Sequence, residues 1–495
     1  MARQPANPRV DQDLTSRPLS RSLLRLALPL AFGQVLHALY AMVDAFWLGR
    51  ENTVSLAAVG ASTPVHFITV AFGMGFANAG TALVAQFTGA RLYRRAEQAA
   101  AQTILVLCGI VLSASVLMQV LLPQVLGWLQ VPEDVRPAAA AYLRIILAAM
   151  PISAFTMAYG GVLRAVGDTL TVIVIIGIGN LVNAVLDPVL IFGWLGLPRM
   201  GVQGAAAATA LCQVGSAIAC FVCLRRGRAG LAIRRTDWKP DWPLIGKTLR
   251  VGLPAAASGS STSIGFAVQQ SMVNTFGKVV MGAYTTGFRI IHVLDAPTQA
   301  MVGATAPVVG QALGAGKPEL ARKAAWTSTL WVAAIMFLPL AFLTWKGHWV
   351  ATKLVPPDVA DELGRFFLFM PLSTYFFGVL SVLTAAFIGS GHTTPIMFLH
   401  IARLWALRIP LVWLFALKLA MGSVGIYVGL AAANITSAAL GLAMFLLIKW
   451  ETAVVPVTQP DAEAEEAGEI VEFEAASQGG GEGAAAAATD RQAAT

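Results

Sequence analysis

Two acidic residues, Asp44 and Asp187, lie within apolar stretches of the N-terminal half of the chain. An ionisable side chain inside a membrane is costly, and by default it marks an ion or substrate path. Further residues precede each acid at intervals of three or four, which places them on one helical stripe with it. Those before Asp44 are Gly33, His37 and Tyr40, and those before Asp187 are Asn180 and Asn183.

These residue types offer two kinds of chemistry. Two carboxylates, amide oxygens and a phenol that face one cavity provide hard oxygen ligands for a sodium ion. The same carboxyls could carry a proton, because burial disfavours their charged form. The residues leave the choice between H⁺ and Na⁺ open. An alternative is that each acid is neutralised locally, for example by Tyr40 or the amides, and only holds helices together.

The C-terminal half carries other ionisable residues in apolar stretches. Asp295 shares a helical stripe with His292 and Gln299, so it is either a second proton or substrate contact or a carboxyl that His292 merely satisfies. Arg403 and Arg408 lie in a later stretch. A partner acid or a phosphate would explain them, but the default expectation is snorkelling to the membrane interface or structural pairing. Asp168 is expected only to cap a helix N-terminus.

An enzymatic function is disfavoured. No phosphate-binding loop, nucleophile elbow or zinc-ligand spacing occurs, and the polar loops are too short for a catalytic domain. The four cysteines all fall in apolar stretches, where small packing residues are the default. We therefore expect no cofactor and no bound metal beyond a coupling ion, which would be H⁺ or Na⁺.

The composition predicts the elements that position these residues. Of 495 residues, 57% are apolar and 12% charged, against about 25% charged in soluble domains. Runs of about 20 apolar residues must cross the membrane as helices. The class is an all-α membrane protein with twelve spans, at about 26–48, 55–80, 99–121, 138–163, 170–192, 204–224, 252–275, 281–304, 325–345, 363–388, 395–418 and 423–448.

The basic residues indicate the topology. They gather in the N-terminal arm and in the loops after the second, sixth and eighth spans, which share one side of the membrane. The positive-inside rule places that side, with both termini, in the cytoplasm. The predicted parts are a cytoplasmic arm (1–25), a six-helix bundle (26–224), a basic linker (225–251), a second bundle (252–450) and a disordered cytoplasmic tail (451–495). Membrane lipids rather than nucleic acid are the expected partners.

The two bundles are predicted to be copies of one unit. An offset of 225 residues places Leu28-Pro29 over Leu253-Pro254, Gln86 over Gln311 and Gly89-Ala90 over Gly314-Ala315. Each copy has an even number of spans, so the two copies are parallel, and a transport cavity is expected between them.

The repeat is unequal in its acids. The same offset places Gln269 at the position of Asp44, and position 187 falls near Arg408 or Ile409. The second copy has therefore lost the acid at both places. This asymmetry favours a coupling-ion site in the N-terminal half.

From about Ser20 to Trp450, the chain resembles the multidrug and toxic compound extrusion (MATE) family, in particular its DinF-like branch. The matching motifs are Leu28-Pro29, Val43-Asp44, Gly49, Gly89-Ala90, Gly167-Asp168-Thr169, Asn183–Phe192, Met200–Thr209 and Leu313–Pro318. The resemblance implies export of organic, often cationic compounds in exchange for H⁺ or Na⁺, by alternating access. It also implies a cation site at Asp44, Asn183, Asp187 and Thr209, with Tyr40 and Asn180 beside them.

For the substrate cavity, the expected residues are His37, Tyr142, Met157, Gln269 and Asp295; Tyr142 matches a polar position in some relatives. The NorM-like branch places acids on the seventh and tenth spans. This chain has no acid within either span, so the resemblance does not extend to a sodium site in the C-terminal half. We expect a multi-pass protein of the bacterial inner membrane that acts as a monomer on small organic substrates.

Two other functions remain open at this point. A flippase for a lipid-linked or anionic compound is the main alternative, and Arg289, Arg403 and Arg408 are the residues that would favour it. A membrane scaffold that transports nothing is the other, and it should tolerate Asp44→Asn without a phenotype.

Overall fold

The computed structural model describes residues 13–51, 53–129, 131–227, 230–231 and 233–455, and the structural statements below concern these ranges. Within them the chain is helical and contains no β-strand. The first 12 residues of the predicted arm, and the predicted tail beyond residue 455, lie outside the described residues.

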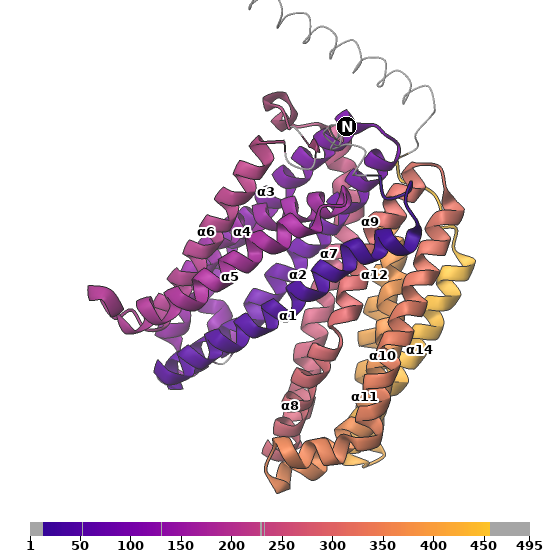
Figure 1. Ribbon diagram of the computed structural model, residues 1–495. Helices are drawn as coiled ribbons and strands as arrows, with labels where there is room; N and C mark the ends of the chain where they lie inside the picture. The colour runs from indigo at the N-terminus through magenta and orange to yellow at the C-terminus, as the bar shows by residue number, and fades with distance from the viewer. Residues whose placement is uncertain (1–12, 52, 130, 228–229, 232, 456–495) are drawn as a thin grey trace, which may run out of the picture.

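Six long helices form the N-terminal lobe (Figure 1). They are α1 (Leu19–Glu51), α2 (Thr53–Gly89), α3 (Tyr93–Trp128), α4 (Arg136–Ala165), α5 (Thr169–Phe192) and α6 (Val202–Arg225). Two short 3₁₀ helices, η2 (Trp194–Gly196) and η4 (Arg235–Trp238), lie in the loops after α5 and α6. As predicted, Asp168 caps α5, because its carboxylate accepts a hydrogen bond from the Thr171 backbone N–H (3.1 Å).

The C-terminal lobe follows the same plan with more interruptions. Its helices are α7 (Trp242–Asn274), α8 (Lys278–Leu294), α9 (Ala296–Gly314), α10 (Pro318–Leu354), α11 (Pro357–Ser390), α12 (Thr393–Ile401), α13 (Ile409–Trp413) and α14 (Gly422–Leu447). The π-helical segment η5 (Ala402–Arg408) joins α12 to α13, and a second one, η6 (Leu414–Lys418), extends α13, so that the four form one continuous span. In the described residues, ten helical spans are long and apolar enough to cross a membrane. With α7 and the α8–α9 pair, they correspond to the twelve predicted spans.

The predicted eighth span is not one helix, because it is broken at Asp295. This residue ends α8 and precedes α9. Pro297 follows two positions later; it has no N–H to continue the α8 hydrogen-bond ladder, and its ring crowds the preceding turn. The break also explains why neither α8 (17 residues) nor α9 (19 residues) stands out as a membrane span by itself.

The two lobes meet at one end of the molecule and diverge towards the other (Figure 1). The contacts between lobes run mainly from α2 to α7 and α9, and from α1 to α9. At Gly89 and Gly314 the approach is so close that an added Cβ would overlap a main-chain carbonyl of the other lobe, that of Gln311 or Gln86 respectively. The two glycines therefore permit a reciprocal helix crossing that no larger residue would.

Gln86 stabilises this crossing through hydrogen bonds to two other segments. Its side chain is fully buried, and its Nε2 donates a hydrogen bond to the Gly389 carbonyl at the end of α11 (3.0 Å). Its Oε1 accepts from the Val455 backbone N–H (3.2 Å). Val455 belongs to the segment 451–495, which was predicted to be a disordered tail. The structure describes residues 451–455 of this segment, and the side chain of Val455 is buried.

Gln311, the repeat partner of Gln86, makes the equivalent contacts. Its Nε2 donates to the Ala165 carbonyl at the end of α4 (2.8 Å), and its Oε1 accepts from the Leu14 backbone N–H (2.9 Å). Each glutamine thus joins a helix end of the opposite lobe to one terminal segment of the chain. We call these four hydrogen bonds the paired glutamine contacts.

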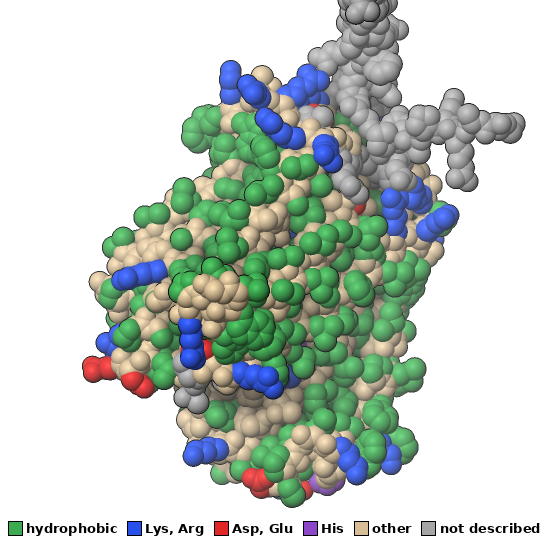
Figure 2. Space-filling model, turned by 60° about the vertical axis from the view of Figure 1, so that its left-hand side comes forward, with side chains coloured by type: hydrophobic (Ala, Val, Ile, Leu, Met, Phe, Trp, Pro, Cys, Tyr) green, Lys and Arg blue, Asp and Glu red, His purple; other side chains and the backbone are tan. Residues whose placement is uncertain are grey.

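Apolar side chains cover much of the outer surface (Figure 2), while charged side chains gather mainly towards its ends. On α5, Leu181 and Val185 are 62% and 66% exposed, and on α10 Leu338 is 73% exposed. Soluble monomers seldom expose contiguous apolar surface of this extent. Such a surface suits a multi-pass membrane protein.

Candidate functional site

Four helices of the N-terminal lobe bring the predicted acids and their neighbours together. Asp44 comes from α1 and Asp187 from α5, while α4 and α6 supply Tyr142 and Thr209. Asp187 is fully buried and Asp44 is half-buried. The packing of α1 on α5 and of α5 on α6 holds these side chains in one cluster.

The two carboxyl groups lie within hydrogen-bonding distance of each other. An ionised carboxylate is only an acceptor, so two of them can bond directly only if one carries a proton. If both were ionised, a cation would be needed between them, because like charges at this distance repel strongly. The Asp44–Asp187 pair is therefore chemically suited to hold one positive charge, as a proton or as a small cation.

Asn183 and Thr209 complete one side of the cluster. With its amide oriented to suit its neighbours, Asn183 donates to Asp187 Oδ2 (3.0 Å) and accepts from the Thr209 backbone N–H (3.1 Å). The Thr209 hydroxyl is hydrogen-bonded to Tyr40 on α1. The predicted spacing of Asn183 and Asp187 thus does place both on one face of α5, towards α6.

Tyr142 and Asn180 lie at the margin of this cluster. The Tyr142 phenol is close enough to interact electrostatically with Asp44 and Asp187. The side-chain Nδ2 of Asn180 is buried and has no hydrogen-bond partner among the described residues. At the margin of the cluster, the Asn180 amide therefore keeps a hydrogen-bond donor without a partner among the described residues.

A cavity of about 260 Å³ lies within the same lobe. His37 on α1 and Met157 on α4 line it, together with His66, Ser153, Gln213 and apolar side chains from α2, α3 and α4. The His37 ring is 6.0 Å from that of Tyr40, between centroids, so the cavity adjoins the acid cluster. The sequence did not single out Gln213, although it follows Thr209 by four residues on one face of α6.

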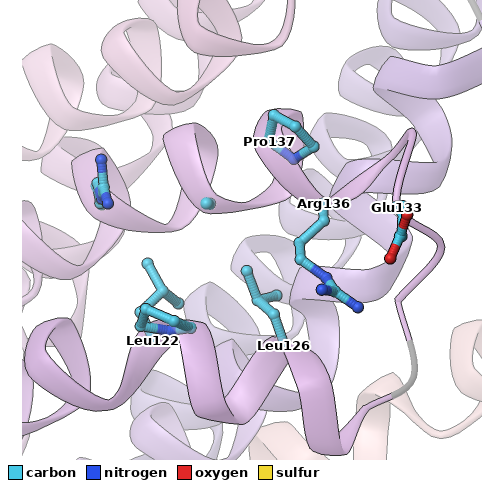
Figure 3. Close-up of a pocket in the computed structure, with 8 residues that line it drawn as sticks. Leu122, Leu126, Glu133, Arg136 and Pro137 are labelled. Atoms are coloured by element: carbon cyan, nitrogen blue, oxygen red, sulfur yellow. The ribbon is translucent and has the colours of Figure 1, made fainter.

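A second cavity, of about 320 Å³, lies between the end of α3 and the start of α4 (Figure 3). Leu122, Leu126 and Pro137 line it, with Glu133 and Arg136 at one end. It contains none of the predicted site residues. We therefore place the chemistry at the acid cluster and not in this larger cavity.

Gln269 and Asp295, also predicted for the substrate cavity, lie in the other lobe. Gln269 on α7 is buried and donates to the Tyr284 hydroxyl on α8. Asp295 accepts from Gln299 Nε2 (2.8 Å) at the α8–α9 break. Neither residue lines the N-terminal cavity, so the structure brings together only part of the predicted substrate set.

Of the two default expectations for Arg403 and Arg408, snorkelling is wrong, whereas structural pairing stays open. They are 2% and 3% exposed and belong to the π-helical segment η5. The guanidinium of Arg403 stacks on Phe377, and that of Arg408 on Phe266. Both are held inside the C-terminal lobe, and no acid among the described residues is paired with either.

A family model described as MatE matches the chain twice, over residues 29–189 and 254–414. The matches begin 225 residues apart, which confirms the predicted duplication. A probable multidrug resistance protein NorM of Thermotoga maritima is 25% identical over 443 residues, covering 88% of this chain and 94% of that protein. A probable multidrug resistance protein YoeA of Bacillus subtilis is 25% identical over 437 residues, covering 86% and 93%.

The fold is also similar to solved structures. One is described as the outward-facing conformation of a multidrug resistance MATE family transporter of the MOP superfamily. It matches with a TM-score of 0.82 at 23% identity, and the match covers 90% of this chain and 98% of that chain. This similarity confirms the predicted all-helical fold.

Proposed function

Because the chain belongs to the MatE family of membrane transporters, we propose that it is a secondary antiporter that exports organic, often cationic compounds in exchange for H⁺ or Na⁺. The relatives named as probable multidrug resistance proteins support the substrate class. The observation that carries the coupling is the contact between Asp44 and Asp187 inside the N-terminal lobe. A carboxyl pair that holds one positive charge is what a cation-coupled transporter requires.

The location of the pair connects the coupling ion to the substrate. The cluster adjoins the 260 Å³ cavity through Tyr40 and His37. A cationic substrate in that cavity and a proton or Na⁺ on the acids would compete for the same negative charge. Antiport follows from such competition, because each ligand must leave before the other is bound.

Alternating access supplies the second half of the proposal. The lobes meet at the end that carries the paired glutamine contacts and diverge at the other (Figure 1). The basic loops after α2 and α9 belong to the closed end, which the positive-inside rule assigns to the cytoplasm. The proposed resting state therefore opens outward from the bacterial inner membrane, with both termini in the cytoplasm.

Antagonism between cation and substrate is the direct test of this function. The purified protein is titrated with a fluorescent aromatic cation across a pH series, with and without Na⁺. We expect acidification or Na⁺ to weaken binding by roughly 5- to 150-fold, the usual range of coupling between two sites. Binding that is indifferent to both pH and Na⁺ would refute the proposal.

The cavity can be tested separately from the acids. Met157→Trp adds a large side chain to the 260 Å³ space and should weaken binding of the same dye by about tenfold, a loss of about 1.4 kcal/mol. Proton or Na⁺ binding at the acids should remain. Leu117→Trp, a change at an exposed apolar position on α3, is the matched control and should bind like the wild type. If Met157→Trp and Leu117→Trp bind the dye equally well, the substrate does not bind in this cavity.

A further inference from the structure

The C-terminal lobe contains a cluster of buried polar side chains, rich in donors, that the proposed antiport does not use. Its members are Gln269 on α7, Tyr284 on α8, and Arg403 and Arg408 on η5. All four are at most 5% exposed. Gln269 contacts Tyr284, and Tyr284 lies close enough to Arg408 to interact with it electrostatically. The cluster is thus built from three segments of one lobe.

The π-helical segment carries both arginines of this cluster on one short stretch of backbone. An α-helix has 3.6 residues per turn, so residues five apart point in different directions. A π-helix bonds residue i to i+5 and therefore stacks them on one face, and such turns are frequent at functional sites. Arg403 and Arg408 are five residues apart, near the start and at the end of η5. Their charges interact electrostatically. The irregular backbone thus carries two interacting positive charges on one short segment.

Most of the hydrogen-bonding capacity of these arginines is unused. Stacking on Phe377 (4.6 Å) and Phe266 (4.8 Å) occupies the guanidinium faces, while N–H donors project from the edges. Among the described residues, Arg408 Nε and Nη1 and Arg403 Nε have no partner, and Arg403 Nη1 makes one long bond to Asn434 (3.3 Å). The donors are fixed in orientation and remain available.

The acids of the same lobe do not compensate this charge. Glu362 accepts from the Tyr427 hydroxyl (2.8 Å) and pairs with Arg365 (3.5 Å). Asp295 is bonded to Gln299. A buried charge without a counter-charge costs several kcal/mol, so two adjacent guanidinium groups require an anion or a comparable set of acceptors.

The repeat gives this cluster a counterpart. Under the 225-residue offset Gln269 stands where Asp44 stands, and Arg408 falls near the position of Asp187. The N-terminal copy offers acceptors that attract a cation, whereas the C-terminal copy offers donors. The same place in the fold therefore has opposite polarity in the two lobes.

We propose that Arg403, Arg408, Gln269 and Tyr284 form an anion-binding site for a carboxylate or phosphate group, carried by a soluble compound or by a lipid headgroup. This site lies beyond the proposed cation-coupled export and does not depend on it. Guanidinium groups bind both kinds of oxyanion through charge-assisted hydrogen bonds. The Tyr284 hydroxyl accepts from Gln269 and keeps its own hydrogen, so it supplies a further donor that Gln269 positions.

The test uses the full chain and two probes. Thermal unfolding in a neutral detergent is followed with increasing inorganic phosphate, with a neutral osmolyte at equal concentration as the reference. In parallel, the protein is released from nanodiscs of phosphatidylglycerol and phosphatidylcholine and weighed by native mass spectrometry. Phosphate should raise the unfolding temperature if the anion is soluble. Retained phosphatidylglycerol, without retained phosphatidylcholine, would identify a lipid headgroup.

Arg408→Gln should lower the affinity for the anion by about tenfold, because one charge-assisted interaction is lost. Arg289→Gln removes an exposed arginine of α8 in the same lobe and should bind like the wild type. Tyr284→Phe keeps both positive charges and removes one hydrogen-bond donor. If Arg408→Gln does not fold, a smaller loss of anion affinity in Tyr284→Phe tests the site instead. Asp187→Asn should retain the anion, which separates this site from the coupling pair.

Absence of both phosphate stabilisation and retained anionic lipid in the wild type would overturn the proposal. Equal anion binding by the wild type, Arg408→Gln and Tyr284→Phe would also overturn it. In that case the arginines would be structural cations satisfied by their aromatic neighbours.

Discussion

Asp187→Asn is expected to reduce cation-coupled transport strongly while leaving the fold intact. Asparagine has nearly the size of aspartate and can still bond to Asn183, but it cannot release a proton or bind a cation by charge. The buried site loses its only fully enclosed carboxylate, and the amide avoids the cost of burying a charge. Substrate-driven cation movement should fall by roughly 5- to 150-fold, the range of typical coupling energies.

Asp361→Asn provides the matched control, because Asp361 is an exposed acid on α11. It changes the formal charge by the same amount and should transport like the wild type. Transport and thermal unfolding are measured for both variants in the same lipid. Coupled transport by Asp187→Asn within about twofold of the wild type, a difference below 1 kcal/mol, would contradict the assigned role.

Gly314→Ala is expected to open the end at which the lobes meet. The added Cβ would overlap the Gln86 carbonyl of α2. The helices cannot shift to avoid this overlap, because at Gly89 they are already in equally close contact with the Gln311 carbonyl. Overpacking of this kind costs about 1–3 kcal/mol. Because the strain exists only while α2 and α9 cross closely, it should shift the population towards a state with this end apart by roughly 5- to 150-fold.

The shift is measured by spin labels at Arg95 and Lys323, which are exposed near the starts of α3 and α10. In a background without the native cysteines, Gly314→Ala should add a longer distance to the wild-type distribution. Gly109→Ala is the control, since a Cβ at this helical glycine meets nothing within 4 Å. A distribution identical to that of the wild type would mean that the crossing does not set the closed state.

The acid cluster could be predicted because its geometry follows from helical spacing. Asp44 with Tyr40, and Asp187 with Asn183, repeat at three or four residues, and such residues share a face whatever the tertiary packing. The apolar runs likewise fixed the number of spans, since backbone in lipid must be helical. That α1 and α5 would turn these faces towards each other came from the family resemblance and not from spacing.

Other features depend on local backbone or on contacts that spacing does not encode. The break at Asp295 had a visible cause in Pro297, but the hydrophobic pattern continues across it. The π-helical segment η5 was not predicted either, and of the two defaults for Arg403 and Arg408, snorkelling or structural pairing, their burial excludes the first. The roles of Gln86 and Gln311 were not predicted, because the repeat marked them as equivalent without showing what they contact.

In the proposed mechanism, the Asp44–Asp187 pair exchanges a cation for an organic substrate. Its most direct test is a substrate gradient imposed across proteoliposomes, with lumenal pH and Na⁺ recorded at zero membrane potential. We predict that the wild type moves H⁺ or Na⁺ against the direction of the substrate and that Asp44→Asn does not. Substrate movement without any cation flux in the wild type, or an undiminished flux in Asp44→Asn, would contradict it.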